Sequence, residues 1–126
     1  MEKEDCIKFC FSTLFVKDME ESIWFYQEII GLPVSRRFNP SPDMEIVFLG
    51  ENGTQIELIQ DKGKEVIEIG PDISWAFTVD SLEAAYQSMK DKGITILSDI
   101  IQPSPHVKFF YIQDPNGMKI QLVENL

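Results

Sequence analysis

One carboxylate distinguishes two nearly identical segments of the chain. GTQIELI (53–59) matches GMKIQLV (117–123), and the chemical difference between them is Glu57 against Gln121. A carboxylate that faces a cavity could act as a general base or bind a ligand cation. Alternatively, Glu57 is a structural group that accepts hydrogen bonds from nearby hydroxyl and amide groups, for which the candidates are Ser12, Ser74 and Gln121. Both interpretations stay open at this point.

Other side chains could complete a site around this carboxylate. His106 lies in PSPHVKFF, where it is either an acid–base or ligand-binding group at a cavity mouth or an exposed loop residue. Phe109, Phe110 and Tyr111 alternate along one segment, so at least one of them should face a cavity and offer a ring for stacking. Phe38 occupies the corresponding region of the first half and is a similar candidate.

These residues lie in a sequence that repeats itself. STLFVKDMEES (12–22) resembles SWAFTVDSLEA (74–84), in which Ser74 lies 62 positions after Ser12. The spacing lengthens to 64 between Glu57 and Gln121, so the second copy gains two residues in a loop. Two copies of about sixty residues indicate a duplicated half-domain rather than a solenoid.

Each copy shows the same order of predicted elements. A strand is followed by a helix that begins at an Asp with a Glu three residues later and ends at a Gly. Three further strands follow, separated by proline and glycine turns that include NPSP (39–42) and QPSP (102–105). The predicted strands are 9–16, 33–38, 44–49 and 54–60, then 73–79, 94–98, 107–113 and 118–123; the predicted helices run from Asp18 to Gly31 and from Asp80 to Gly93.

This order predicts an α+β fold of two tandem βαβββ modules. We expect a curved eight-stranded mixed sheet around a cavity, with the helices on its convex face. The whole chain, 1–126, should form one domain, with module 1 at about 7–60, a linker at about 61–71 and module 2 at about 72–124. Strand alternation is expected to place four residues on the small or polar face: Ser12, Glu57, Ser74 and Gln121.

Composition narrows the classes of partner. A net charge of −10 disfavours nucleic acid and anionic membrane surfaces, and is compatible with a cationic or neutral ligand. Together with the ring side chains above, it predicts a cationic or aromatic small molecule as the partner. No apolar run approaches the ~20 residues of a membrane span, and the first ten residues mix charges. We therefore expect a cytoplasmic protein in which Cys6 and Cys10 are reduced.

Two stretches carry a family resemblance, VKDMEESIWFYQEIIGL (16–32) and FFYIQDPNGMKIQLVE (109–124). Together with the duplication, they resemble the vicinal oxygen chelate superfamily over nearly the whole chain. That superfamily includes glyoxalase I, extradiol dioxygenases, methylmalonyl-CoA epimerase, fosfomycin-resistance enzymes and bleomycin-binding proteins. The resemblance implies a ligand cavity and a homodimer, but not one particular chemistry.

The resemblance also implies where a metal would bind. Metal-dependent members use His and Glu side chains at four strand positions, which match Ser12, Glu57, Ser74 and Gln121 here. Among these, Glu57 alone is a usual ligand, and too few good donors remain to offset dehydration of a divalent ion. We therefore expect no cofactor. The alternative is a bound divalent metal ion, which could be nickel, cobalt, zinc, manganese or iron.

Three functions fit these observations. The first is metal-free binding of a small molecule in the cavity, as the resemblance to bleomycin-binding proteins implies. The second is a lyase or isomerase similar to lactoylglutathione lyase, with a degenerate metal site and Glu57 as the candidate catalytic residue. The third is a non-catalytic dimerisation module whose cavity has become core. Whether the protein is an enzyme is left open by the sequence.

Overall fold

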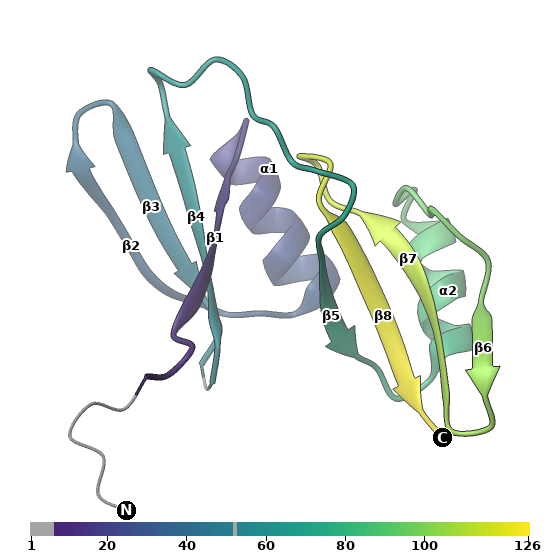
Figure 1. The fold of residues 1–126 in the computed structure, drawn as a ribbon. Coiled ribbons are helices and arrows are strands. Elements are labelled where there is room, and N and C mark those ends of the chain that lie inside the picture. Colours follow the sequence, from purple (N-terminus) through teal and green to yellow (C-terminus); the bar gives the residue numbers. More distant parts are fainter. Residues whose placement is uncertain (1–6, 52) are drawn as a thin grey trace, which may run out of the picture. The chain divides into compact units, whose positions relative to one another are not determined.

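A computed structural model describes residues 7–51 and 53–126 of the chain (Figure 1). The chain divides into two compact units, Met1–Ile67 and Glu68–Leu126, here called the first and second modules. The boundary falls inside the predicted linker, 61–71. The predicted α+β class and the two tandem βαβββ modules are confirmed, whereas the expectation of one domain stays a prediction. Within the described residues, no helix has the length and apolar character to cross a membrane.

The first module forms a four-stranded mixed sheet. Its strand order is β1-β4-β3-β2, with β1 parallel to β4 and the other neighbours antiparallel. The helix of this module continues without interruption into a π-helical segment, which has a wider turn than an α-helix. The elements are β1 (Phe11–Phe15), α1 (Met19–Trp24), η1 (Phe25–Ile30), β2 (Val34–Ser41), β3 (Met44–Leu49) and β4 (Gln55–Asp61).

The second module repeats this topology. Its strand order is β5-β8-β7-β6, again with one parallel pair, β5 and β8, beside antiparallel neighbours. The eight strands are therefore hydrogen-bonded as two four-stranded mixed sheets. The elements are β5 (Ser74–Thr78), α2 (Leu82–Asp91), β6 (Ile101–Ser104), β7 (Val107–Gln113) and β8 (Lys119–Asn125).

Each sheet buries one face against the helix of its own module. In the first module, α1 packs against β4, and Val47 and Leu58 are fully buried there. In the second module, α2 packs against β7 and β8, where Phe110 and Leu122 are buried. Removing such side chains from water stabilises the fold by roughly 1.5–3 kcal/mol each. The opposite side of each sheet, here called its open face, carries the alternate residues and is where chemistry can take place.

The helix start in the second module differs from the prediction. In the first module, Asp18 Oδ1 accepts a hydrogen bond from the backbone N–H of Glu21 at 3.0 Å, as expected for an N-cap. In the second module, the N-cap is Ser81, whose Oγ accepts from the N–H of Ala84 at 3.3 Å, so the prediction of Asp80 was wrong. The caps are 63 positions apart, not 62.

The same one-residue difference affects the first strands. Thr13 lies opposite Glu57, and Ala76 lies opposite Gln121, so Thr13 corresponds to Ala76 at a spacing of 63. The helix ends at Gly31 and Gly93 still lie 62 apart. The first helix therefore holds one residue more between its N-cap and its glycine, and the wide turn of η1 accommodates it. A one-residue shift in a strand moves each side chain to the other face of the sheet.

Two predicted strand boundaries were also wrong. The segment 94–98 forms a single bridge from Ile96 to Ile112, and the strand next to β7 is β6, at Ile101–Ser104. In the first module β2 continues through Pro40 to Ser41, where a turn was expected. Both β2 and β6 are the last strands of their sheets, and an outer strand tolerates proline because one of its edges has no hydrogen-bonding neighbour.

Candidate functional site

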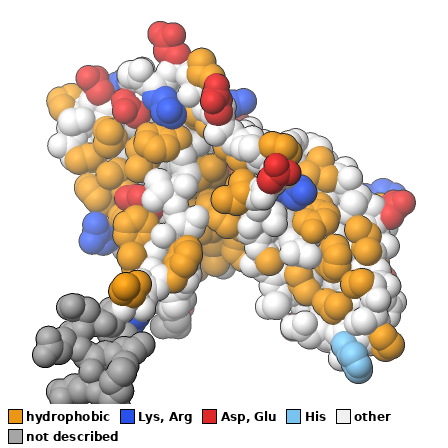
Figure 2. All heavy atoms as spheres, viewed as in Figure 1, with side chains coloured by type: hydrophobic (Ala, Val, Ile, Leu, Met, Phe, Trp, Pro, Cys, Tyr) orange, Lys and Arg blue, Asp and Glu red, His pale blue; other side chains and the backbone are white. Residues whose placement is uncertain are grey.

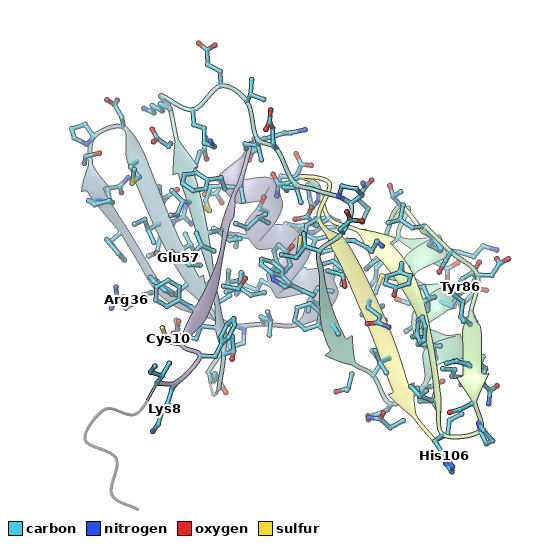
Figure 3. The ribbon with its side chains drawn as sticks, in the orientation of Figure 1. Lys8, Cys10, Arg36, Glu57, Tyr86 and His106 are labelled. Atoms are coloured by element: carbon cyan, nitrogen blue, oxygen red, sulfur yellow. The ribbon has the colours of Figure 1, made fainter. Side chains whose placement is uncertain are left out.

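A row of four residues crosses the open face of the first module, with one residue on each strand. Arg36 on β2 pairs with Phe48 on β3, Phe48 pairs with Glu57 on β4, and Glu57 pairs with Thr13 on β1. Side chains of directly opposed residues lie on the same face of a sheet and are close enough to interact. The strand register therefore brings a cation, an aromatic ring, a carboxylate and a hydroxyl group into one line. Figure 3 labels the two charged members of this row, Arg36 and Glu57.

Glu57 is anchored through one of its two carboxylate oxygens. The hydroxyl group of Thr13 donates a hydrogen bond to Glu57 Oε1 at 2.6 Å. Within the part of the chain that the structure describes, Oε2 has no hydrogen-bond or ion-pair partner. The carboxylate is therefore held in place while one oxygen stays available on the open face.

Arg36 stacks on two rings of the same face. Its guanidinium carbon lies 4.9 Å from the ring centroid of Phe38 and 5.0 Å from that of Phe48, within the range of cation–π attraction. Among the described residues, Arg36 forms no ion pair and its guanidinium N–H groups donate no hydrogen bond. The two rings orient the guanidinium group, and its donors remain free.

The neighbouring arginine has a different environment. Arg37 lies on the helix side of the sheet, where it binds the carboxylates of Glu45 and Glu20. The hydrogen bonds that Arg37 donates to these two carboxylates raise its pKa above the ordinary value, with Glu45 contributing the larger part. The charge of Arg37 is thus compensated by two carboxylates of the fold, whereas that of Arg36 is not paired with a carboxylate of the described residues.

Around this row the open face forms a pocket of about 520 Å³, a size usual for small-molecule sites. The rings of Phe11 and Phe48 meet edge to face with centroids 5.2 Å apart. Gln55 Nε2 donates to Ser35 Oγ at 3.0 Å and to the carbonyl of Gly50 at 2.9 Å, which fixes one wall. Figure 2 shows hydrophobic side chains gathered on the first module with charged ones among them. The pocket is lined by Phe11, Ser35, Arg36, Phe38, Phe48, Gln55 and Glu57.

The open face of the second module carries related residues without a carboxylate. Gln121 lies between Tyr111 on β7 and Ala76 on β5. Lys119 Nζ lies 4.8 Å from the ring centroid of Tyr111, and Phe109 contacts the same ring edge to face at 5.7 Å. This face therefore has a cation over an aromatic ring, beside a neutral amide.

Most predicted site residues lie on the open faces. Glu57 and Phe38 line the pocket of the first module. Ser74 pairs with Lys119 and so shares the open face of the second module with three other predicted residues, Phe109, Tyr111 and Gln121.

The prediction that Ser12 lies on the open face of the first module was wrong. Ser12 pairs with Ile56 and alternates with Thr13, so it lies on the helix side of the sheet together with Leu14. Its register differs from the expected one because the repeat spacing is 63 rather than 62 in this strand. The residue of the first module that corresponds to Ser74 is Phe11, which pairs with Gln55 as Ser74 pairs with Lys119.

His106 does not lie beside the other predicted residues of its module. It is exposed in the turn between β6 and β7 (Figure 3). Its backbone N–H donates to Ser104 Oγ at 3.1 Å, and its carbonyl accepts from Leu126 N at 2.8 Å. Five residues of extended chain, about 16 Å, separate it from Tyr111. The alternative of an exposed loop histidine describes what the structure shows.

Sequence reasoning missed Thr13, Arg36 and Phe48 as site residues. Thr13 was assigned to the other face by the one-residue error in register. Arg36 lies two residues before Phe38, and this even spacing on a strand was the signal that both share a face. Phe48 had no signal beyond its place in β3, because its role follows from pairing with both Arg36 and Glu57.

The donor atoms do not fit a divalent metal. With the observed register, the four positions at which the resembled superfamily binds metal are Phe11, Glu57, Ser74 and Gln121. Phe11 has no donor atom, and the only ionised ligand of the four is Glu57. No group of three or more His, Cys, Asp or Glu residues that could hold an ion occurs within 7–51 and 53–126.

Comparisons with known proteins agree on one family. Residues 8–122 match the model of the Glyoxalase/Bleomycin resistance protein/Dioxygenase superfamily. The chain is 30% identical over 116 residues to the uncharacterized protein YwbC of Bacillus subtilis, covering 88% of this chain and 92% of that one. It is 29% identical over 123 residues to a lactoylglutathione lyase of Haemophilus influenzae, covering 89% and 88%. A solved glyoxalase family protein from Bacillus cereus has the same fold, with a TM-score of 0.84 at 20% identity over 100% and 99% of the chains.

Proposed function

This chain belongs to the Glyoxalase/Bleomycin resistance protein/Dioxygenase superfamily, and we propose that it binds a small organic molecule in the pocket of the first module without a metal ion. The observation that carries this proposal is the row of Arg36, Phe48 and Glu57 that lines the pocket, in which the Thr13 hydroxyl group holds Glu57. It combines an apolar ring with free hydrogen-bond donors and a free acceptor oxygen. Such a combination orients a ligand as well as burying it.

The aromatic side chains supply the affinity expected of the pocket. Phe11, Phe38 and Phe48 offer ring surface that is only partly covered by the protein itself. Covering this surface with an apolar ligand contributes roughly 25 cal/mol per Å² of apolar area removed from water. The polar groups then select among ligands of similar size, because a buried donor or acceptor without a partner costs about 1–3 kcal/mol.

A ligand screen by nuclear magnetic resonance tests this proposal. We expect aromatic fragments to shift the amide resonances of Phe48 and Glu57, and the Phe48→Ala variant to lose these shifts. Tyr111→Ala is the matched control, since it removes the corresponding ring of the second module. A broad fragment set that leaves the resonances of the first module unchanged would contradict binding in this pocket.

Metal content tests the second part of the proposal. The protein is equilibrated with nickel, cobalt, zinc, manganese and iron(II), and bound metal is measured by mass spectrometry. We expect far less than one ion per chain, with no difference between the wild type and Glu57→Ala. Near-stoichiometric metal that disappears in Glu57→Ala would contradict the argument from donor atoms.

A lyase or isomerase activity is the second candidate. The match to a lactoylglutathione lyase over most of both chains favours it. In a metal-free form, Glu57 would move the proton as the sole base, and neutral groups would hold the developing oxyanion. We expect no turnover of a hemithioacetal substrate, with or without added nickel, cobalt or zinc. Turnover that is lost in Glu57→Gln would place this activity ahead of simple binding.

We further propose a homodimer in the cytoplasm. Support for the dimer comes from family membership and from exposed large apolar side chains, including Phe9, Trp24 and Ile73. The cytoplasmic location rests on composition alone. Light scattering after size-exclusion chromatography should give the mass of two chains, and a monomeric mass across micromolar concentrations would contradict the dimer.

A further inference from the structure

We propose that the ligand of this pocket carries an anionic group bound by Arg36 and, at its other end, a hydrogen-bond donor bound by Glu57, with an aromatic body between them. This inference rests on the proposed binding function and names the class of ligand. It reverses the expectation that a protein with a net charge of −10 prefers cations. The local charges of the pocket, rather than the total charge, are what a bound ligand meets at short range.

Arg36 is prepared to bind an anion. Phe38 and Phe48 hold its guanidinium group by the ring contacts at 4.9 and 5.0 Å, so little side-chain freedom remains to be lost on binding. Its donors have no protein partner among the described residues. A guanidinium group binds a carboxylate through two parallel hydrogen bonds, the geometry in which its planar fork is strongest.

A cationic ligand fits this pocket poorly. The ring surfaces of Phe38 and Phe48 that would attract a cation already interact with the guanidinium group. A second positive charge stacked there would be repelled by Arg36. Arg37 cannot offer an equivalent anion site, because it is already ion-paired with Glu45 and Glu20.

Glu57 defines the other end of the ligand. Its Oε1 is taken by the Thr13 hydroxyl group, and its Oε2 is free to accept a hydrogen bond from a ligand hydroxyl group. Arg36 and Glu57 lie on strands two apart in the sheet, so their backbones are separated by about 10 Å. Phe48 lies between them in the row. The ligand therefore lies along the row beside Phe48, with its anionic end toward β2 and its donor end toward β4.

Four probes of matched size test this assignment. The first, 3-(4-hydroxyphenyl)propionate, has both polar ends. The second, 3-phenylpropionate, lacks the hydroxyl group; the third, 4-(3-hydroxypropyl)phenol, lacks the carboxylate; and tyramine carries a cation instead. Dissociation constants come from resonance titrations, which also locate the bound probe. We expect the first probe to bind about tenfold or more tightly than the third and fourth.

Variants assign this preference to individual residues. Arg36→Met should abolish the advantage of the carboxylate, while Arg36→Lys should keep part of it, because a lysine retains the charge but not the planar fork. Glu57→Gln should reduce the advantage of the hydroxyl group. Lys119→Met is the control, since it removes the cation over the ring of the second module and should leave all four constants unchanged.

The outcomes separate this inference from the proposed function. If tyramine or the alcohol binds in the pocket as tightly as the carboxylate, pocket binding stands and the anionic ligand class is overturned. The same holds if Arg36→Met and Arg36→Lys keep the carboxylate preference of the wild type. If none of the four probes shifts the resonances of Phe48 and Glu57 at millimolar concentration, both proposals fail.

Discussion

The two modules share one fold but carry different chemistry on their open faces. In the first module, Glu57 lies between Phe48 and Thr13, whose hydroxyl group binds it. In the second, Gln121 lies between Tyr111 and Ala76, which has no hydrogen-bonding side chain. Arg36 has no strand counterpart, because β6 pairs with β7 only up to Phe109. The complete row of charged groups therefore exists in the first module alone.

A second difference runs in the opposite direction at the helix starts. Gln60 Oε1 accepts a hydrogen bond from Met19 N at 2.8 Å in the first module. In the second, Glu124 Oε1 accepts from Leu82 N at 2.6 Å. The first module thus has its carboxylate on the open face and its amide at the helix start, whereas the second module has the reverse arrangement. Either group can accept a hydrogen bond from a helix N–H, so the fold tolerates both, whereas the open face changes its charge.

The largest expected effects test whether the modules are energetically independent. Leu58 and Leu122 are the corresponding core residues of β4 and β8, and both are buried. Replacing either with Ala should lower the free energy of unfolding by about 3 kcal/mol through lost burial and a cavity. If the chain is one domain, calorimetry should show one transition that shifts in both variants. Two transitions, each sensitive to one variant, would contradict a single domain.

Exchanging the central polar residues tests the chemical difference. Glu57→Gln should weaken binding of 3-(4-hydroxyphenyl)propionate about tenfold, because a neutral amide is a weaker acceptor than a carboxylate. Gln121→Glu should leave this affinity unchanged. Isothermal titration measures both variants. Equal losses in the two would show that the second module contributes to binding as much as the first.

The helix starts should differ by a smaller amount. Gln60→Ala removes one acceptor from α1 and should cost about 1 kcal/mol of stability. Glu124→Ala should cost more, up to about 2 kcal/mol, because a carboxylate at a helix N-terminus also interacts with the helix dipole. Urea unfolding measures these losses. Glu124→Gln is the control and should recover about half of the loss, because its amide oxygen still accepts the hydrogen bond. If Glu124→Gln is as unstable as Glu124→Ala, the whole effect comes from the charge.

The smallest effect concerns an ion pair of the second module. Lys108 binds Glu83 and lowers the pKa of this carboxyl below its ordinary value of 4.5, while Glu83 raises the pKa of Lys108 above 10.5. A lowered acid pKa contributes stability above the unfolded value, which is lost as pH falls through the folded value. A raised lysine pKa contributes stability that is lost as pH rises through the folded value.

The pair should therefore stabilise the protein most between these two limits. The stability difference between the wild type and Glu83→Gln, measured by urea unfolding, should be largest near neutral pH and shrink below pH 4.5. It should remain small throughout, because exposed ion pairs contribute little. A difference that grows on acidification would contradict this assignment.

Local patterns in the sequence were sufficient for much of the fold. The duplication, the βαβββ order and the alternation in β4 and β8 are visible in short segments, because burial of one sheet face imposes a period of two. The same alternation placed Glu57 and Gln121 on the faces opposite the buried residues of these two strands. The prediction of a strand at 94–98 was wrong, because a short apolar run does not show which segment will pair with the neighbouring strand.

The sequence by itself determined that one half carries a lone carboxylate where the other carries an amide. Only the tertiary structure decided what surrounds it, because cross-strand register depends on pairing between distant segments and on the extra residue in η1. That register placed Thr13 rather than Ser12 against Glu57. It also turned Arg36 toward the open face and Arg37 toward Glu45 on the other, a division that two adjacent arginines in a sequence cannot reveal.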